Sequence, residues 1–176
     1  MTVFSTTDFQ GISGMDYQAA AVKLTRYKDR GYLESPKRGV YYLSDQAPDD
    51  WELANYLYRP SYISLDTALS HYGLIPEVVY VVTSVSTKAT RELADARMVY
   101  KYFKLKREVF TGYRKEKGYL IAGMEKAVVD YVYFVAIGKR ELNDRLNLTK
   151  VDKGEIRRWV EMFNNQRLTN LMKELL

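Results

Sequence analysis

Residues 16–43 read DYQAAAVKLTRYKDRGYLESPKRGVYYL and predict an amphipathic helix followed by a short hairpin. Asp16 can cap the start of the helix, and Gly31 can end it. Three apolar residues between them recur at i, i+4 and i+7, which is the spacing of one buried helix face: Ala20, Leu24 and Tyr27. Residues 32–33 and 40–43 are strand-like, and the turn-forming sequence SPKRG separates them.

A shorter helix is expected just before this stretch. Ser5, Thr6 and Thr7 are candidate N-caps for a helix through Phe9, and Gly11, Ser13 and Gly14 are expected to break it. The order helix, turn, helix, hairpin is that of a winged helix-turn-helix, in which the second helix enters the major groove of DNA. The further helix that usually precedes this motif is expected to be missing.

The outward face of the second helix carries polar and cationic side chains suited to DNA. Gln pairs with adenine and Arg with guanine, while Lys and Thr suit phosphates. Two cations at the hairpin tip can follow the DNA backbone. The predicted DNA-binding residues are therefore Gln18, Lys23, Thr25, Arg26, Arg30, Lys37 and Arg38. An ordinary solvated helix and hairpin explains the same pattern, and spacing alone does not separate the two interpretations.

The rest of the chain predicts a larger mixed domain. Residues 44–50, with Pro48, resemble a linker, so we expect a DNA-binding domain at 1–48 and a second domain at 49–176. Met124, Val128, Tyr131 and Val135 form the apolar stripe of one further helix. The predicted class is α+β, with helices at 51–59, 64–73, about 124–135, 152–163 and 168–175 and strands at 78–85, 97–105, 108–112 and 118–122, the last two as a hairpin.

Composition excludes several classes of protein. The 176 residues contain no cysteine, which removes disulfides and thiolate metal sites. The N-terminus lacks the pattern of a signal peptide. The longest apolar stretch, 127–138, is interrupted by Asp130 and is shorter than the roughly 20 residues of a membrane span. We therefore expect a cytoplasmic protein without a membrane partner.

The net charge of +5 is concentrated in one segment. Residues 101–117 contain two acids, Glu108 and Glu116, and seven cations: Lys101, Lys104, Lys106, Arg107, Arg114, Lys115 and Lys117. Six aromatic residues alternate with these cations, from Tyr100 to Tyr119. Such a basic strip is typical of an RNA-binding or protein-interaction module. The pattern favours instead a half-buried sheet whose lysines lie on the wet face and edges.

An enzyme is the least favoured class. Glu77, Glu125 and Lys126 are the candidates for a metal-dependent nuclease, but an acid in the first turn of a helix also complements the helix dipole. The single histidine, His71, has no metal-ligand spacing around it and is interpreted as structural. The chain contains no phosphate-binding loop. We expect no catalytic residue, no metal and no cofactor.

Three stretches together resemble the AbiEi-type antitoxins of type IV toxin–antitoxin systems, which act in abortive infection. The first is RYKDRGYL at 26–33 with RGVYYL at 38–43, similar to the end of the recognition helix and the wing of that family. The second is PSYISLDTAL at 60–69, continuing to YGLIPE at 72–77. The third is YLIAGMEKAVVD at 119–130. Their order and spacing span nearly the whole chain.

The resemblance implies two functions in this order along the chain. An N-terminal winged helix binds operator DNA and represses its own operon. A C-terminal domain counteracts a partner toxin, usually a nucleotidyltransferase, as part of phage defence, and a simple stable complex with the toxin is not generally implied. The missing first helix is the point at which this chain departs from the family pattern.

Overall fold

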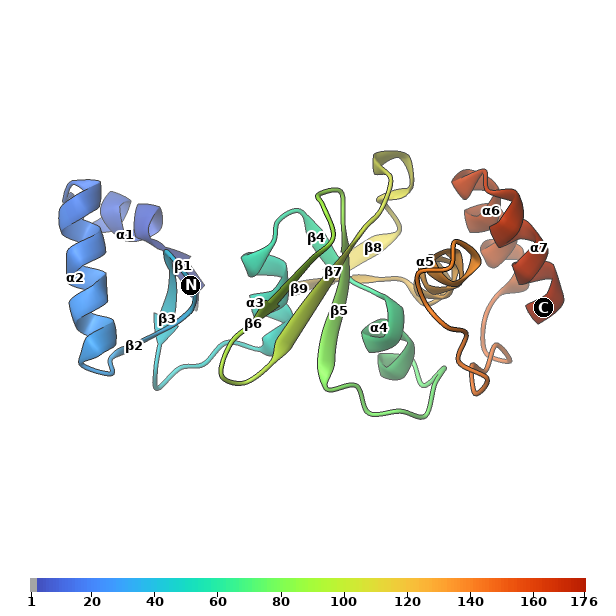
Figure 1. Ribbon diagram of the computed structural model, residues 1–176, viewed down its shortest axis with the longest axis horizontal. Coiled ribbons are helices and arrows are strands. Elements are labelled where there is room, and N and C mark those ends of the chain that lie inside the picture. The colour runs from blue at the N-terminus through green and yellow to red at the C-terminus, as the bar shows by residue number, and fades with distance from the viewer. Residues whose placement is uncertain (1–2) are drawn as a thin grey trace.

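A computed structural model describes residues 3–176 and confirms an α+β fold with two sheets (Figure 1). From one end of the molecule to the other, the helices and sheets are stacked in layers. The helices α1 (Thr6–Ser13) and α2 (Tyr17–Asp29) lie at one end, next to the small sheet. The helices α6 (Lys153–Phe163) and α7 (Gln166–Leu175) lie at the other end, and the large sheet lies between them.

The small sheet is antiparallel and has the order β1-β3-β2. Its strands are β1 (Val3–Ser5), β2 (Leu33–Lys37) and β3 (Val40–Leu43). The sequence did not predict β1, which is three residues long and is specified only by its pairing with β3. Strand β2 continues through Pro36, where the predicted strand had already ended. An edge strand tolerates proline because one side of its backbone needs no partner.

The first helix is longer than expected. It runs to Ser13, through Gly11, and ends at Gly14, whose φ of 69° is left-handed. Ser5 and Asp8 form a reciprocal capping box at its start. The single Gly11 weakens the helix without ending it, because a glycine in a helix costs only about 1 kcal/mol relative to alanine.

The large sheet has six strands in the order β6-β7-β5-β4-β9-β8. They are β4 (Ser61–Ile63), β5 (Val81–Ser86), β6 (Arg91–Ala94), β7 (Val99–Lys104), β8 (Tyr113–Glu116) and β9 (Tyr119–Ala122). Strand β4 pairs with β5 over three residues but with β9 at a single position, Ile63 opposite Ile121. The sheet therefore has a weak seam between β4 and β9.

One sequence prediction for this sheet was wrong, and two strands were not predicted. Residues 108–112 are not a strand: Arg107–Val109 form a 3₁₀ turn, and the hairpin is instead β8–β9 with its turn at Lys117 and Gly118. The strands β4 and β6 were missed. Each is short, and β6 has the sequence RELA, without the β-branched or aromatic residues that mark a strand.

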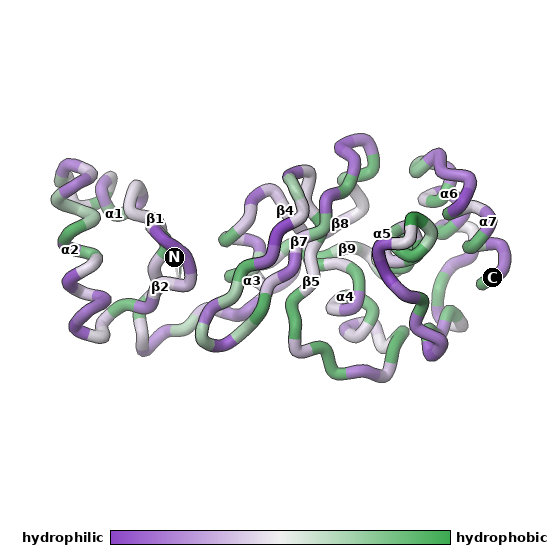
Figure 2. The backbone as a smooth tube through the Cα atoms, viewed as in Figure 1, coloured by the Kyte–Doolittle hydropathy of each residue, from purple (hydrophilic) through white to green (hydrophobic). Residues whose placement is uncertain are grey.

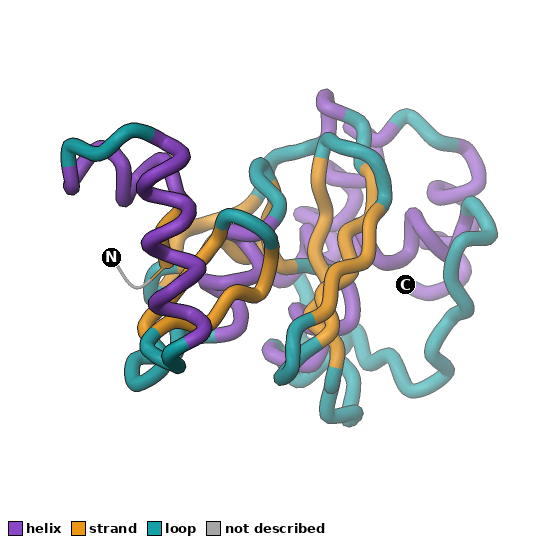
Figure 3. Tube along the Cα trace, turned by 60° about the vertical axis from the view of Figure 1, so that its left-hand side comes forward, coloured by secondary structure: helices purple, strands orange, loops and turns teal. Residues whose placement is uncertain are grey.

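Helices cover both faces of the large sheet. On one face, the Tyr102 hydroxyl donates to the Ala54 carbonyl of α3 (Asp50–Leu57) at 2.7 Å. On the other face, Phe103 packs against Phe134 of α5 (Met124–Ala136), and α4 (Leu65–His71) lies beside it. Figure 3 shows α5, α6 and α7 on the side of the large sheet away from the N-terminal elements.

Helix α5 is buried more completely than its predicted stripe. Val128 and Tyr131 are buried as expected, whereas Met124 and Val135 are only partly covered. The whole run from residue 126 to 132 is buried, including Lys126 and Asp130. This follows from its position, since α4, α6 and α7 all pack against α5.

The N-terminal elements contact the second part of the chain directly. Val3 and Tyr42 belong to the same core cluster as the large sheet. The Tyr56 hydroxyl of α3 donates to the Asp8 carboxylate at 2.8 Å. The Arg97 guanidinium lies 5.3 Å from the ring centroid of Tyr42. The segment predicted as a linker, 44–50, therefore joins two parts that also share packing.

Candidate nucleic-acid interface

Helix α2 has one buried face and one exposed face. The Asp16 carboxylate caps it by accepting from the backbone N–H of Ala19 at 2.9 Å. Ala20 and Leu24 are fully buried, and Leu24 packs in a small cluster with Leu33 and Tyr41. This anchors the helix against the small sheet. Hydrophobic and hydrophilic residues alternate along it (Figure 2).

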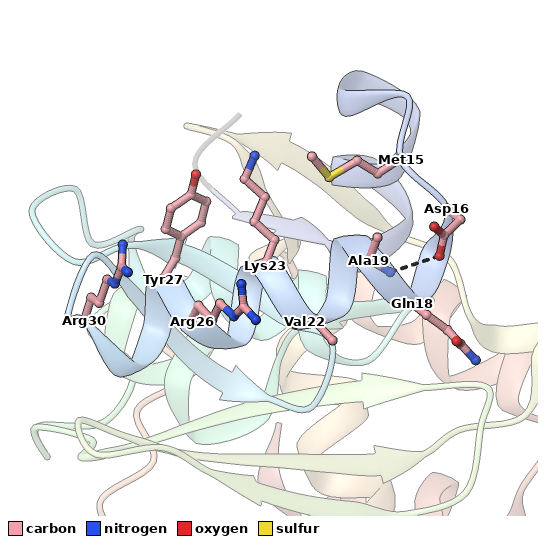
Figure 4. Close-up of a pocket in the computed structure, with 9 residues that line it drawn as sticks. All are labelled: Met15, Asp16, Gln18, Ala19, Val22, Lys23, Arg26, Tyr27 and Arg30. Carbon is pink, nitrogen blue, oxygen red and sulfur yellow. Dashed lines mark hydrogen bonds between the residues drawn. The ribbon is translucent and has the colours of Figure 1, made fainter.

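The exposed face of α2 borders a shallow surface hollow, drawn in Figure 4. The predicted residues Gln18, Lys23, Arg26 and Arg30 all line it. Lys23 Nζ lies 5.9 Å from the ring centroid of Tyr27. Within residues 3–176, none of the three cations forms an ion pair with an acid. The fold thus gathers these four side chains on one surface, and its three cations have no ion-pair partner among residues 3–176.

Thr25 lies outside this hollow. Its side chain is exposed, and its hydroxyl donates to the Ala21 carbonyl one turn earlier at 2.9 Å. A hydroxyl held in this way keeps its oxygen lone pairs for a further donor, but its own proton is engaged.

The two cations of the hairpin tip have different environments. Arg38 is exposed, as expected. Lys37 instead turns toward the second part of the chain, and its Nζ donates to the Leu57 carbonyl at the end of α3 at 3.1 Å. Burial lowers the pKa of Lys37, and the nearby Arg91 and Lys88 lower it further. The structure therefore places Lys37 at a junction and leaves Arg38 as the outward tip cation.

Lys37 also marks a basic surface that the sequence did not indicate. Lys88 and Arg91, whose charges act on Lys37, are both exposed. Arg59 follows two residues after Leu57, the residue that Lys37 bonds, and its guanidinium lies 4.2 Å from the ring centroid of Tyr56. These cations come from three separate places in the chain, so no local sequence pattern could have grouped them with the hairpin.

The predicted basic strip is divided by the sheet. Lys101 and Lys104 lie on β7, and Lys106 and Arg107 follow in the connection. Arg114, Lys115 and Lys117 belong to the β8–β9 hairpin. Strands β5, β4 and β9 separate the two groups, about 19 Å at the usual strand spacing. Lys101 and Arg114 are paired with Glu92 and Glu116 at 3.3 Å each.

The aromatic residues of that strip are largely inside the fold. Tyr100, Tyr102 and Tyr119 are buried, and Phe103 and Phe110 are partly buried. Tyr113 keeps 39% of its surface exposed, but its ring stacks on Tyr62. This arrangement does not offer the row of free rings that stacking on nucleic-acid bases requires.

The three candidates for a nuclease do not converge. Glu77 is paired with Arg145, and Glu125 accepts from the backbone N–H of Asp152 at 3.1 Å. Lys126 is fully buried and bonds Asp130 and Tyr62. Over residues 3–176, no group of three or more His, Asp or Glu side chains is arranged to hold a metal ion.

Lys126 belongs to a buried polar network that the sequence did not reveal. Its Nζ pairs with Asp130 and donates to the Tyr62 hydroxyl at 2.9 Å. The second carboxylate oxygen of Asp130 accepts from Tyr62 and from Ser64, each at 2.9 Å. Burial raises the pKa of Asp130 and lowers the pKa of Lys126, while the attraction between the two groups opposes both shifts.

His71 lies at the end of α4 in an aromatic group. Its ring packs edge-on against Trp51, with centroids 5.2 Å apart, and its Nε2 lies 3.9 Å from Glu116. These contacts join α4 to α3 and to the β8–β9 hairpin, as a structural histidine does.

A conservative change at Glu125 should have a small effect. Glu125→Gln keeps an oxygen that can accept from Asp152 and removes only the charge in the first turn of α5. We expect a loss of at most about 1 kcal/mol, the scale of a helix-dipole contact, in urea unfolding followed by circular dichroism. Metal-dependent nuclease activity that is present in the wild type and absent from this variant would contradict a structural role.

No helix within residues 3–176 is long and apolar enough to cross a membrane. Comparison with models of known protein families gives no match for the chain, and comparison with curated protein sequences gives none either.

Proposed function

We propose that this protein is a DNA-binding autorepressor and antitoxin of a type IV toxin–antitoxin system, which counteracts a nucleotidyltransferase toxin in the cytoplasm. The observation that carries the DNA-binding part is the exposed face of α2. There a capped, anchored helix presents Gln18, Lys23, Arg26 and Arg30 without acidic partners. Cations left uncompensated on one surface attract a polyanion.

The order of the N-terminal elements supports the same proposal. The order of a strand, two helices and a two-stranded hairpin, with β1 paired to β3, is compatible with a winged helix-turn-helix. Arg38, exposed at the hairpin tip, supplies a cation for the DNA backbone next to the groove.

The antitoxin part rests on the resemblance of residues 60–77 and 119–130 to AbiEi-type antitoxins. The exposed cations Lys104, Lys106, Arg114 and Lys115 are the surface residues proposed to act against the toxin. Binding of RNA through aromatic stacking is the weaker alternative, because the aromatic residues of the strip are covered.

Replacing Arg26 with alanine should reduce the preference for operator over random DNA. If Arg26 reads a guanine through two hydrogen bonds, the loss is about 1–3 kcal/mol. Lys28→Ala is the matched control, because Lys28 is also exposed but lies on the flank of α2 away from the hollow. It removes the same charge without removing a base contact. A gel-shift titration with the promoter of the protein's own operon measures both.

Salt dependence separates base reading from backbone contact in the same titration. Arg38→Ala should weaken binding to all sequences alike and reduce the slope of log K against log salt by about one unit. The DNA-binding proposal fails if wild type does not shift the promoter, and the base-reading role of Arg26 is contradicted if Arg26→Ala prefers the promoter over random DNA no less than Lys28→Ala does.

A further inference from the structure

An apolar residue occupies the middle of the exposed face of α2. Val22 has 52% of its surface exposed and lies between the polar residues Gln18 and Arg26, with Ala19 beside it on the same face. At 100° per residue it points about 160° away from both Ala20 and Leu24, the fully buried residues of the helix. Figure 4 shows Val22 directed away from the helix body, between Gln18 and Arg26.

Packing within the protein does not explain an apolar residue at position 22. Its side chain contributes to neither core cluster. A β-branched residue lowers helix propensity, and an exposed apolar surface gains nothing from burial. Single exposed apolar residues are common, so exposure alone indicates nothing. The argument rests on its neighbours.

Gln18, Val22 and Arg26 form one row at i, i+4 and i+8 along the helix. In the major groove, Gln pairs with adenine, Arg pairs with guanine, and an apolar group contacts the C5 methyl of thymine. These are three of the contacts by which a helix distinguishes base pairs. The same spacing continues to Arg30, the C-cap residue of α2, which lines the hollow as well.

We propose that Val22 is a specificity-determining residue that contacts the methyl group of a thymine in duplex DNA. This inference rests on the proposed DNA-binding function. Residues four apart are separated by about 6 Å along the helix, and base pairs by about 3.4 Å. The thymine therefore lies about two base pairs from the adenine read by Gln18, with the guanine read by Arg26 about two base pairs further on.

The same chemistry selects DNA over RNA. Uracil lacks the C5 methyl group, and the major groove of an RNA helix is too deep and narrow for a helix to enter. Val22, the apolar residue in the cationic face of α2, therefore finds a methyl group to contact in DNA and none in RNA.

The test replaces thymine with deoxyuridine, which removes only the methyl group. Wild-type protein first selects a duplex from a random DNA pool, and each thymine of the selected site is then replaced in turn. At one thymine we expect a loss of affinity of about fourfold, the worth of one buried methyl group. Val22→Ala should bind the thymine duplex about as weakly as wild type binds the uracil duplex, and should not distinguish the two.

Ile12→Ala is the matched control, since Ile12 is 82% exposed but lies on α1 outside the hollow. It should keep the full response to deoxyuridine. Circular dichroism checks the fold of both variants. The inference is overturned if Val22→Ala retains the wild-type response while binding DNA specifically, which leaves the proposed function intact. Failure to select any duplex, or selection from an RNA pool instead, overturns the DNA-binding function itself.

Discussion

Replacing Asp130 with alanine is expected to lower the free energy of unfolding by about 3–5 kcal/mol, because it leaves the Lys126 ammonium buried without its partner. The side chains of both residues are 0% exposed. Lys126 would keep the Tyr62 hydroxyl and the nearby rings of Trp159 and Phe163, none of which carries a negative charge. With typical domain stabilities of about 5–15 kcal/mol, this is a large part of the total. Urea unfolding followed by circular dichroism measures it.

Two further variants make this prediction specific. Lys126→Met combined with Asp130→Leu removes both charges and should recover much of the loss, since apolar replacements of a buried pair are often tolerated. Tyr62→Phe should cost about 1–3 kcal/mol, because it removes a donor to Asp130 and an acceptor for Lys126. If Asp130→Ala costs no more than Glu125→Gln, the pair is not the buried network described above.

Reversing the charges of Lys104, Lys106, Arg114 and Lys115 to glutamate is expected to abolish rescue of cells that express the toxin. The four side chains are exposed, so the change should leave the fold intact. Whether they meet RNA or an acidic surface of the toxin, a reversed charge turns attraction into repulsion. Growth under co-expression of toxin and the full chain measures rescue. The full chain is used because Val3 and Tyr42 pack into the core of the second part.

The positions of the four residues in the fold allow this charge reversal to be made in two separate pairs. Lys104 and Lys106 can be reversed separately from Arg114 and Lys115, since three strands lie between the two groups. The pair that acts on the toxin should reproduce the loss of rescue by itself. If the quadruple variant is folded and rescues growth as well as wild type does, these cations only keep the sheet surface hydrated.

Local signals in the sequence predicted the N-terminal elements well. Asp16 caps α2 as its residue type predicts, and Ala20 and Leu24 are buried as their spacing predicts. These features depend on residues within a few positions of one another. Strand β1 was not predictable from such local signals, because it forms by pairing with β3, more than thirty residues later.

The environment of individual cations was not predictable in the same way. Lys37 and Arg38 are adjacent in sequence, yet one bonds the end of α3 and the other is exposed. From the sequence, Lys126 was a candidate residue of a nuclease and Asp130 was an interruption of an apolar stretch. Their partners Tyr62 and Ser64 lie more than sixty residues earlier in the chain. Such contacts come from the topology of the large sheet, which no local pattern specifies.

The seam between β4 and β9 has a consequence for motion. Between β4 and β9 the backbone ladder is reduced to the single pair of Ile63 and Ile121. Side chains hold β9 on this side instead. The backbone N–H of Leu120 donates to the Asn55 side chain, and the Tyr72 hydroxyl donates to the Ala122 carbonyl at 2.7 Å. Opening the sheet here breaks few backbone bonds, so local unfolding and amide hydrogen exchange should begin at this seam. The β8–β9 hairpin is thus the part of the large sheet that backbone pairing holds least, and the side chains of Asn55 and Tyr72 set how readily it separates from β4.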